Sequence, residues 1–109
     1  MKETGVNLGP IFLAAGLPEP ETEVRFHTTR KWKWDWAWRR WKVALEKQGS
    51  TWTGGRHTRG AGYRNDAEKL AEGQIAGWLV IYATSDMLRD GTAFELVQKA
   101  LESRGWRKS

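Results

Sequence analysis

The clearest pattern in this chain is a run of alternating polar and apolar positions from Lys31 to Gln48, which reads KWKWDWAWRRWKVALEKQ. Tryptophan occupies every second position from Trp32 to Trp38, and the alternation resumes at Trp41. Because successive side chains of a β-strand point to opposite faces, this pattern predicts two strands. We expect them to form a β-hairpin with Arg39-Arg40 as a two-residue loop.

The register of this hairpin determines which side chains share a face. A two-residue loop puts Asp35 opposite Ala44 and makes Asp35 and Glu46 diagonal neighbours, roughly 7–8 Å apart. It also puts Lys33 directly opposite Glu46, where the two could form an ion pair. One face then carries Trp34, Trp36, Trp38, Trp41, Val43 and Leu45. The other face carries Lys33, Asp35, Ala37, Lys42, Ala44, Glu46 and Gln48.

The rest of the chain predicts helices on both sides of this hairpin. The expected elements are a short helix at residues 10–15, a strand at 23–29, a helix at about 66–76, a strand at 78–83, a helical turn after Thr84 and an amphipathic helix at 92–103. The apolar run WLVIYA at 78–83 is typical of a strand buried on both faces. Asn65 or Asp66 would cap the helix before it. The inner face of that helix would carry Ala67, Leu70, Ala71 and Gln74.

Length and composition narrow the class of protein. The 109 residues suit a single α/β domain, with helices packed against a central mixed sheet of about four strands. A net charge of +5 favours a polyanionic partner such as nucleic acid. The absence of cysteine excludes disulfides and zinc–thiolate sites. Without a signal-peptide pattern or a long apolar stretch, we expect a cytoplasmic protein with no membrane segment.

The segment 49–64 reads GSTWTGGRHTRGAGYR and is rich in glycine and arginine. Long loops inside compact domains are often functional, and arginines on a flexible backbone suit phosphate contacts. We expect DNA contacts from Arg56, His57, Arg59 and Arg64 in this loop, and from Lys33 in the hairpin. The alternative is a basic loop with no specific role.

The polar face of the hairpin favours phosphodiester chemistry. Asp35 and Glu46 can hold a hard divalent cation such as Mg²⁺ between adjacent strands. Such an ion neutralises charge on a scissile phosphate and helps to produce hydroxide from water. Gln48 follows two residues after Glu46, projects beside it, and can orient the attacking water.

These residues resemble the PD-(D/E)xK superfamily of nucleases. Four stretches, VALE at 43–46, WTGGRHTRG at 52–60, NDAEK at 65–69 and GW at 77–78, are similar to a group of small phage and prophage endonucleases. That group is akin to VRR-type nucleases and to archaeal-type Holliday junction resolvases. The resemblance covers roughly Glu23 to Met87.

The resemblance implies a restriction-endonuclease-like core, in which a helix, a three-strand meander, a second helix and a fourth strand follow in that order. It implies Mg²⁺-dependent cleavage of DNA, with Mn²⁺ able to replace Mg²⁺. The implied substrate is branched DNA such as a four-way junction. The implied assembly is a homodimer that cuts two strands symmetrically in a bacterial or phage-infected cell.

The resemblance also implies roles for individual residues. Asp35 matches the metal-binding aspartate of the superfamily, and Glu46 matches the acid of the (D/E)xK element. Gln48 stands where the superfamily usually has lysine. The carbonyl of Lys47, between these two positions, would be a further metal ligand.

Two more roles complete this expected site. Members of the superfamily usually carry another acid on the first helix, for which Glu3 is the first choice and Glu23 the alternative. Lys69, on the helix after the glycine-rich loop, could supply the positive charge that Gln48 lacks.

Three functions are therefore open at this stage. The first is a Mg²⁺-dependent DNA endonuclease selective for branched DNA. The second is a non-catalytic DNA-binding module on a nuclease-like scaffold, which the uncharged Gln48 favours. The third is an interaction protein that uses the tryptophan-rich hairpin as a binding surface.

Overall fold

The computed structural model describes residues 8–48 and 59–108 of the chain. Its elements are α1 (Gly9–Ala14), β1 (Glu21–Arg25), β2 (Lys33–Trp38), β3 (Val43–Lys47), α2 (Arg59–Ile75), β4 (Leu79–Ala83), α3 (Ser85–Asp90) and α4 (Thr92–Ser103). The predicted order of a short helix, three strands, a helix, a strand and further helices is confirmed. The predicted bounds of the first strand are wrong, because β1 begins two residues earlier than expected and ends at Arg25.

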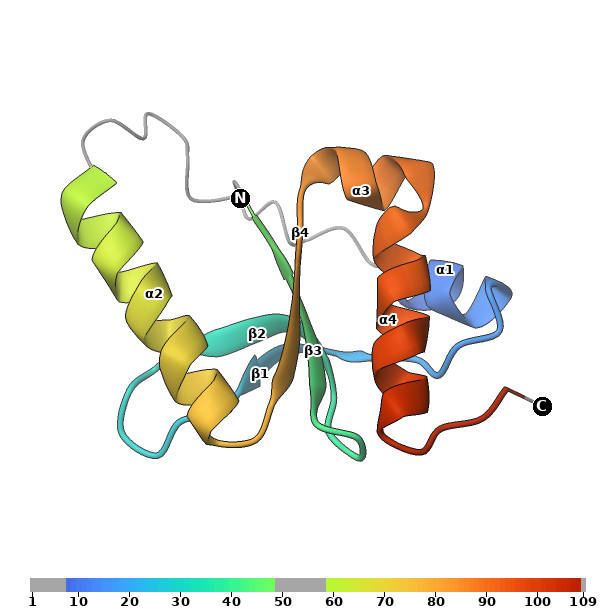
Figure 1. Ribbon diagram of the computed structural model, residues 1–109, viewed down its shortest axis with the longest axis horizontal. Coiled ribbons are helices and arrows are strands. Elements are labelled where there is room, and N and C mark those ends of the chain that lie inside the picture. Colours follow the sequence, from blue (N-terminus) through green and yellow to red (C-terminus); the bar gives the residue numbers. More distant parts are fainter. Residues whose placement is uncertain (1–7, 49–58, 109) are drawn as a thin grey trace.

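The four strands form one mixed sheet in the order β1-β2-β3-β4. The pairs β1–β2 and β2–β3 are antiparallel, whereas β3 and β4 are parallel. Figure 1 shows α2 on one side of the sheet and α1, α3 and α4 on the other. The expectation of an α/β fold with helices against a mixed four-stranded sheet is therefore confirmed. No helix in the described ranges is long and apolar enough to cross a membrane.

The main core lies between the sheet and the helices α1 and α4. The strands contribute Trp36, Trp38, Val43 and Leu45, and the helices contribute Phe12, Ala93, Val97, Ala100 and Leu101. Phe12 meets Trp38 edge to face, with ring centroids 5.0 Å apart. The amphipathic helix predicted at 92–103 thus buries its apolar stripe, as expected.

The hairpin between β2 and β3 has a four-residue turn, and the predicted two-residue loop is wrong. Trp38 pairs with Val43, and the turn residues between them close with hydrogen bonds from Trp41 N to Trp38 O and from Lys42 N to Arg39 O. Trp36 lies opposite Leu45 rather than Val43, so the register differs from the expected one by two residues. A shift by an even number of residues leaves every side chain on its face. Continued by one pair, the observed register puts Asp35 directly opposite Glu46.

The prediction of one tryptophan face is wrong for Trp34. Trp34 packs with Ala37 and Ala44 on the α2 side of the sheet, whereas Trp36 and Trp38 belong to the main core on the other side. The pairing of β1 with β2 skips the position between Glu23 and Asp35, and Glu23 has a φ of 55°. A positive φ at a non-glycine residue departs from regular strand geometry. The alternation of side chains is broken here, which leaves Trp34 free to pack beneath α2.

Helix α2 begins earlier than predicted. It includes residues 59–64, so Asn65 and Asp66 lie within the helix and neither caps it. Among the residues of α2 whose burial is described, Gly73 is the buried one, whereas Ala67, Ala71 and Gln74 are exposed. A side chain at Gly73 would have its Cβ 2.5 Å from two ring carbons of Trp34. The helix can therefore approach the sheet this closely only because Gly73 has no side chain.

The last strand is an edge strand, and the prediction that it is buried on both faces is wrong. β4 stands at the end of the sheet, beside β3 only. Most of its residues are half-buried, and Tyr82 is 41% exposed. The apolar run in the sequence could not reveal the position of the strand within the sheet.

The contact between Gly73 and Trp34 predicts the sign of a substitution. Gly→Ala inside a helix ordinarily stabilises a protein by up to about 1 kcal/mol. Gly73→Ala should instead destabilise this protein by about 1–3 kcal/mol, because the new methyl group overlaps the Trp34 ring. Urea unfolding measures the free energy. The double variant Gly73→Ala with Trp34→Phe is the control, because the smaller phenylalanine ring relieves the overlap. If the changes in the free energy of unfolding of the two single variants simply add in the double variant, this account is wrong.

Candidate functional site

The two middle strands of the sheet bring Asp35 and Glu46 together. Each carboxylate accepts a hydrogen bond from the backbone of the opposite strand. Asp35 N donates to Glu46 Oε2 at 3.2 Å, and Lys47 N donates to Asp35 Oδ2 at 2.9 Å. The predicted placement of both acids on one face is confirmed. They lie directly opposite each other, which brings them closer together than the predicted diagonal positions would. The two bonds fix both side chains at the β2–β3 junction.

Lys69 is the basic partner of this pair. Its Nζ donates to Glu46 Oε2 at 2.8 Å and lies 5.2 Å from the ring centroid of Trp34. Lys69 belongs to α2, so this ion pair ties the helix to the central strands. The structure places the Lys69 ammonium on Glu46, and the expectation that it supplies the charge that Gln48 lacks stays a prediction. The alternative in which Lys33 pairs with Glu46 does not hold, because Lys33 pairs with Glu23 at 3.3 Å and Glu46 pairs with Lys69.

The Glu46 carboxyl group is buried, with 8% of the residue exposed. Burial raises its pKa to about 7, because a charged carboxylate loses hydration inside the protein. The Lys69 ammonium lowers the pKa of Glu46, but less than burial raises it. The nearby Asp35 charge raises this pKa further. Since a metal ion binds the ionised form, a cation at this site would compete with a proton near neutral pH.

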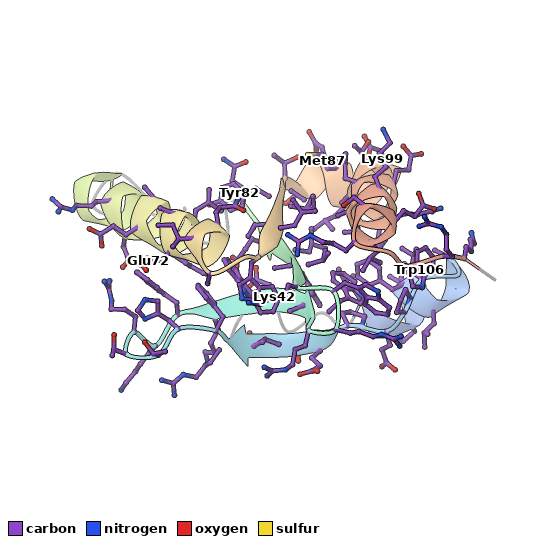
Figure 2. All side chains as sticks on the ribbon, turned by 60° about the horizontal axis from the view of Figure 1, so that its bottom comes forward. Lys42, Glu72, Tyr82, Met87, Lys99 and Trp106 are labelled. Atoms are coloured by element: carbon purple, nitrogen blue, oxygen red, sulfur yellow. The ribbon has the colours of Figure 1, made fainter. Side chains whose placement is uncertain are left out.

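A small cavity of about 20 Å³ adjoins Glu46. Its lining includes Trp34, Glu46, Asp66, Lys69, Leu70 and Tyr82. A cavity of this size can hold one water-sized occupant. Tyr82 lies beside Glu46 in the β3–β4 register and projects from β4 on the side of α2 (Figure 2).

Asp66 and Tyr82 are the two polar residues of this cavity that the sequence did not suggest. Asp66 resembles a helix cap in the sequence, but it precedes Lys69 by one helical turn and so shares its face. That spacing is the signal that could have identified it. Tyr82 lies in an apolar run, and only the parallel pairing of β4 with β3 brings it to Glu46.

Two carboxylates with a backbone carbonyl nearby are a suitable donor set for Mg²⁺, which takes one or two protein carboxylates and keeps several waters. Gln48 follows β3 directly, its side chain is exposed, and its N donates to Ala83 O. Within 8–48 and 59–108 no group of three or more acidic, histidine or cysteine side chains could hold a metal ion. The other expected acid, Glu3, lies outside the described residues.

The predicted DNA-contacting residues are only partly described. Arg56 and His57 lie outside the described residues, and of Arg59 only the backbone is described, in the first turn of α2. The predicted loop end at 59–64 is helical. Arg64 is exposed there, and its Nε donates to Glu68 at 3.1 Å.

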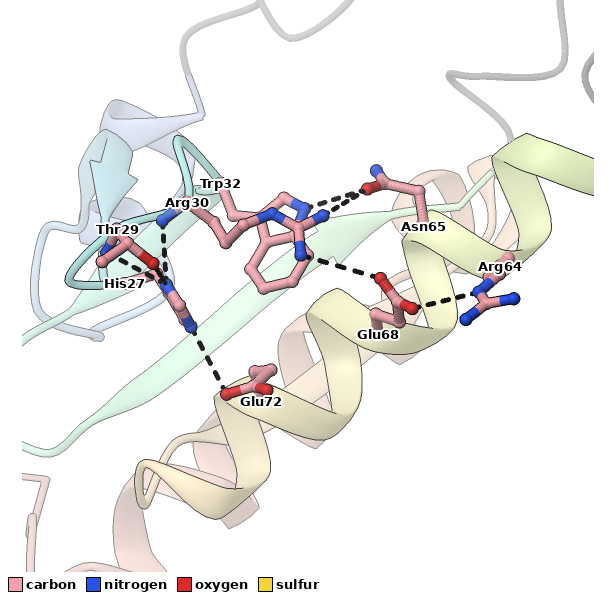
Figure 3. Close-up of polar contacts among 8 residues, drawn as sticks. All are labelled: His27, Thr29, Arg30, Trp32, Arg64, Asn65, Glu68 and Glu72. Carbon is pink, nitrogen blue, oxygen red and sulfur yellow. Dashed lines mark hydrogen bonds and ion pairs between the residues drawn. The ribbon is translucent and has the colours of Figure 1, made fainter.

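A polar network that the sequence did not suggest joins the β1–β2 connection to α2 (Figure 3). Arg30 donates to Asn65 and pairs with Glu68, at 3.2 and 3.7 Å. His27 Nδ1 accepts from the backbone N of Arg30 at 2.9 Å, and its Nε2 lies 3.3 Å from Glu72. These contacts hold the helix that carries Lys69 in its position over the sheet.

No protein family, curated protein or solved structure matches this chain. The chemistry of the site therefore has to be inferred from its own residues. The site consists of two carboxylates held by backbone hydrogen bonds and a lysine that donates to one of them. A cavity large enough for one water lies beside it.

The raised pKa of Glu46 predicts a pH-dependent stability. Below about pH 4.5 the carboxyl group is neutral in both states, and above about 7 its ionisation disfavours the folded state. The wild type should therefore lose roughly 3 kcal/mol relative to Glu46→Gln as pH rises through this window. Urea unfolding in EDTA across pH 4–8 measures the difference.

Glu95→Gln is the matched control, since Glu95 is an exposed carboxylate in the first turn of α4. The variant Glu95→Gln makes the same chemical change, from a carboxylate to an amide, at a position far from Lys69. A difference between the wild type and Glu46→Gln that stays constant with pH would show that Glu46 is not the titrating group.

Proposed function

We propose that this protein is a Mg²⁺-dependent DNA endonuclease of the PD-(D/E)xK type. The observation that carries the proposal is the pair Asp35 and Glu46, fixed on adjacent central strands with Lys69 at 2.8 Å from Glu46. The order of α1, the three-strand meander, α2 and the parallel strand β4 also supports it. That order is the one the resemblance to this superfamily implies.

The residues of the site fit roles in phosphodiester hydrolysis. Asp35 and Glu46 would hold Mg²⁺, with the Lys47 carbonyl as a further ligand. The ion would supply charge neutralisation at the phosphate and a more acidic water. The backbone hydrogen bonds that orient both carboxylates would keep them in position without rearrangement.

Lys69 accounts for the glutamine in the (D/E)xK element. Gln48 carries no charge, so it can orient a water by hydrogen bonds but cannot neutralise a phosphate. The Lys69 ammonium reaches Glu46 from α2 and would provide that charge. Gln48 would then orient the water and Lys69 would supply the positive charge, two roles that one lysine usually has in the superfamily.

The proposed substrate is branched DNA, such as a four-way junction, and the proposed assembly is a homodimer in the cytoplasm. The net charge of +5 is consistent with a DNA partner. Arg56, His57, Arg59 and Arg64 are proposed to contact the phosphate backbone, together with Lys33. Mn²⁺ should substitute for Mg²⁺, because both accept carboxylate and water ligands.

The second candidate is a non-catalytic DNA-binding module. The observations in its favour are that Glu46 already has a cationic partner in Lys69 and that no group of three or more acidic, histidine or cysteine side chains in the described ranges could hold a metal ion. Such a module would bind DNA without metal, with an affinity that falls steeply as salt rises.

Cleavage of a labelled four-way junction, beside its matching linear duplex, tests the proposal. With Mg²⁺ the wild type should cut the junction, and EDTA should abolish cutting. Asp35→Asn should lower the rate about a hundredfold or more, because it removes a metal ligand worth several kcal/mol to the transition state. Asp86→Asn, the same change at an exposed position on α3, should cut like the wild type.

The outcomes of this assay separate the candidates. Equal cutting of junction and duplex would keep the nuclease and reject the preference for branched DNA. An Asp35→Asn variant that cuts normally would reject the metal site. Tight binding with no product in Mg²⁺ or Mn²⁺ would favour the non-catalytic module.

A further inference from the structure

A larger groove of about 610 Å³ lies away from the acids. It is bounded by residues 16–18 after α1, by the β2–β3 turn and by the chain that follows α4. Figure 2 shows Trp106 in this region, where the chain leaving α4 runs beside α1. None of the residues that line it lines the cavity at Glu46. The groove is therefore a separate feature of the fold.

The charged side chains of this groove are all positive. They are Arg40 from the hairpin turn and Arg107 and Lys108 from the C-terminal segment. Arg107 donates to the backbone carbonyls of Glu102 and Trp106. Within the described part of the chain, none of the three cations forms an ion pair, and no carboxylate lines the groove. Three cations with no ion-pair partner among the described residues create a positive potential that favours an anionic ligand.

Two tryptophans accompany these cations. Trp41 and Trp106 are half-buried, and both pack their inner surface against the main core. The Arg40 guanidinium lies over the Trp41 ring, 5.0 Å from its centroid. Indole rings and guanidinium planes are the surfaces on which proteins stack nucleobases. A simple phosphate site would need the cations only, so the aromatic rings favour a ligand that carries bases.

Gly16 gives one wall of the groove its shape. Its φ is 85°, a conformation that favours glycine, and a Cβ there would lie 2.6 Å from Lys108 Cε. Because Gly16 has no side chain, the aliphatic part of Lys108 can lie across this wall. The Lys108 ammonium, which remains exposed, is thereby placed beside the groove wall.

We propose that this groove binds single-stranded nucleic acid, with phosphates on Arg40, Arg107 and Lys108 and a base against Trp106. Its volume is in the range of ordinary ligand pockets and suits roughly one or two nucleotides. Arg40 lies in the hairpin turn, five residues after Asp35 and at most roughly 18 Å from it along the chain. Binding here needs no metal, and it goes beyond the cleavage proposed for Asp35 and Glu46.

Fluorescence anisotropy of a short labelled oligothymidylate, in EDTA, tests this inference. The double variant Arg40→Ala with Lys108→Ala removes two exposed cations of the groove. We expect affinity to fall about tenfold at low salt, and the slope of log affinity against log salt to decrease by about 1.4. The matched control is Arg25→Ala with Lys99→Ala, which removes the same charge from exposed positions outside the groove; Lys99 lies on α4 away from Trp106 (Figure 2).

The base contact needs its own comparison. An abasic oligomer of equal length and charge should bind the wild type several times more weakly than oligothymidylate. Trp106→Leu should remove most of that preference, and Trp106→Phe, which retains an aromatic ring, should keep part of it. Equal affinity for both oligomers would overturn the nucleic-acid assignment and indicate a general polyanion site, such as one for an acidic protein.

Each result bears on the groove independently of cleavage. If the groove variant and the charge control weaken binding equally, the groove is not the binding site. Asp35→Asn should bind oligothymidylate like the wild type, whatever its effect on cleavage. A protein that binds the oligonucleotide through the groove but never cleaves DNA would support the groove proposal and reject the nuclease proposal. A protein that cleaves DNA but does not bind in the groove would support the nuclease proposal and reject the groove proposal.

Discussion

The buried ion pair between Glu46 and Lys69 is the interaction on which the arrangement of the sheet and α2 depends. Glu46 is on a central strand, Lys69 is on the helix above it, and both are largely shielded from water. Removing two charges from water costs several kcal/mol per ion, and an apolar pair of similar size would often stabilise a fold equally well. Stability alone therefore does not account for the pair. The proposed metal site would account for it, because a cation there binds the ionised form of Glu46.

The position of Lys69 follows from the packing of Gly73 one turn further along α2. Trp34 lies under both residues: its ring takes the space of a Cβ at Gly73, and the Lys69 ammonium is 5.2 Å from its centroid. Gly73 therefore sets the separation of helix and sheet, and this separation lets Lys69 reach Glu46 at 2.8 Å. The network of Arg30 with Asn65 and Glu68 supports the same helix from its side. Trp34, which lies on the opposite side of the sheet from Trp36 and Trp38, therefore links the packing of α2 to the position of Lys69.

The sequence predicted the order of the elements and the shared face of Asp35 and Glu46, because both follow from local periodicity. The length of the hairpin turn was not predictable from that periodicity, since a shift by two residues leaves the alternation unchanged. The side taken by Trp34 depends on α2, and the start of α2 depends on glycine-rich residues whose low helix propensity suggests a loop. Strand order is a tertiary property, so neither the edge position of β4 nor the contact of Tyr82 with the cavity could be read from an apolar run.

The four-residue turn links the two sites. By lengthening the connection, it moves Asp35 from a diagonal position to one directly opposite Glu46, where each carboxylate accepts a hydrogen bond from the opposite strand. The same turn carries Arg40 and Trp41 out to the wall of the basic groove. One hairpin therefore contributes both to the proposed metal site and to the proposed nucleic-acid groove. Arg40 follows Asp35 by five residues, which is at most roughly 18 Å along the chain. The acids face α2 and the groove lies beside α1 and α4, on opposite sides of the sheet, so a strand bound at the proposed groove would have to pass around the hairpin turn to reach the proposed metal site.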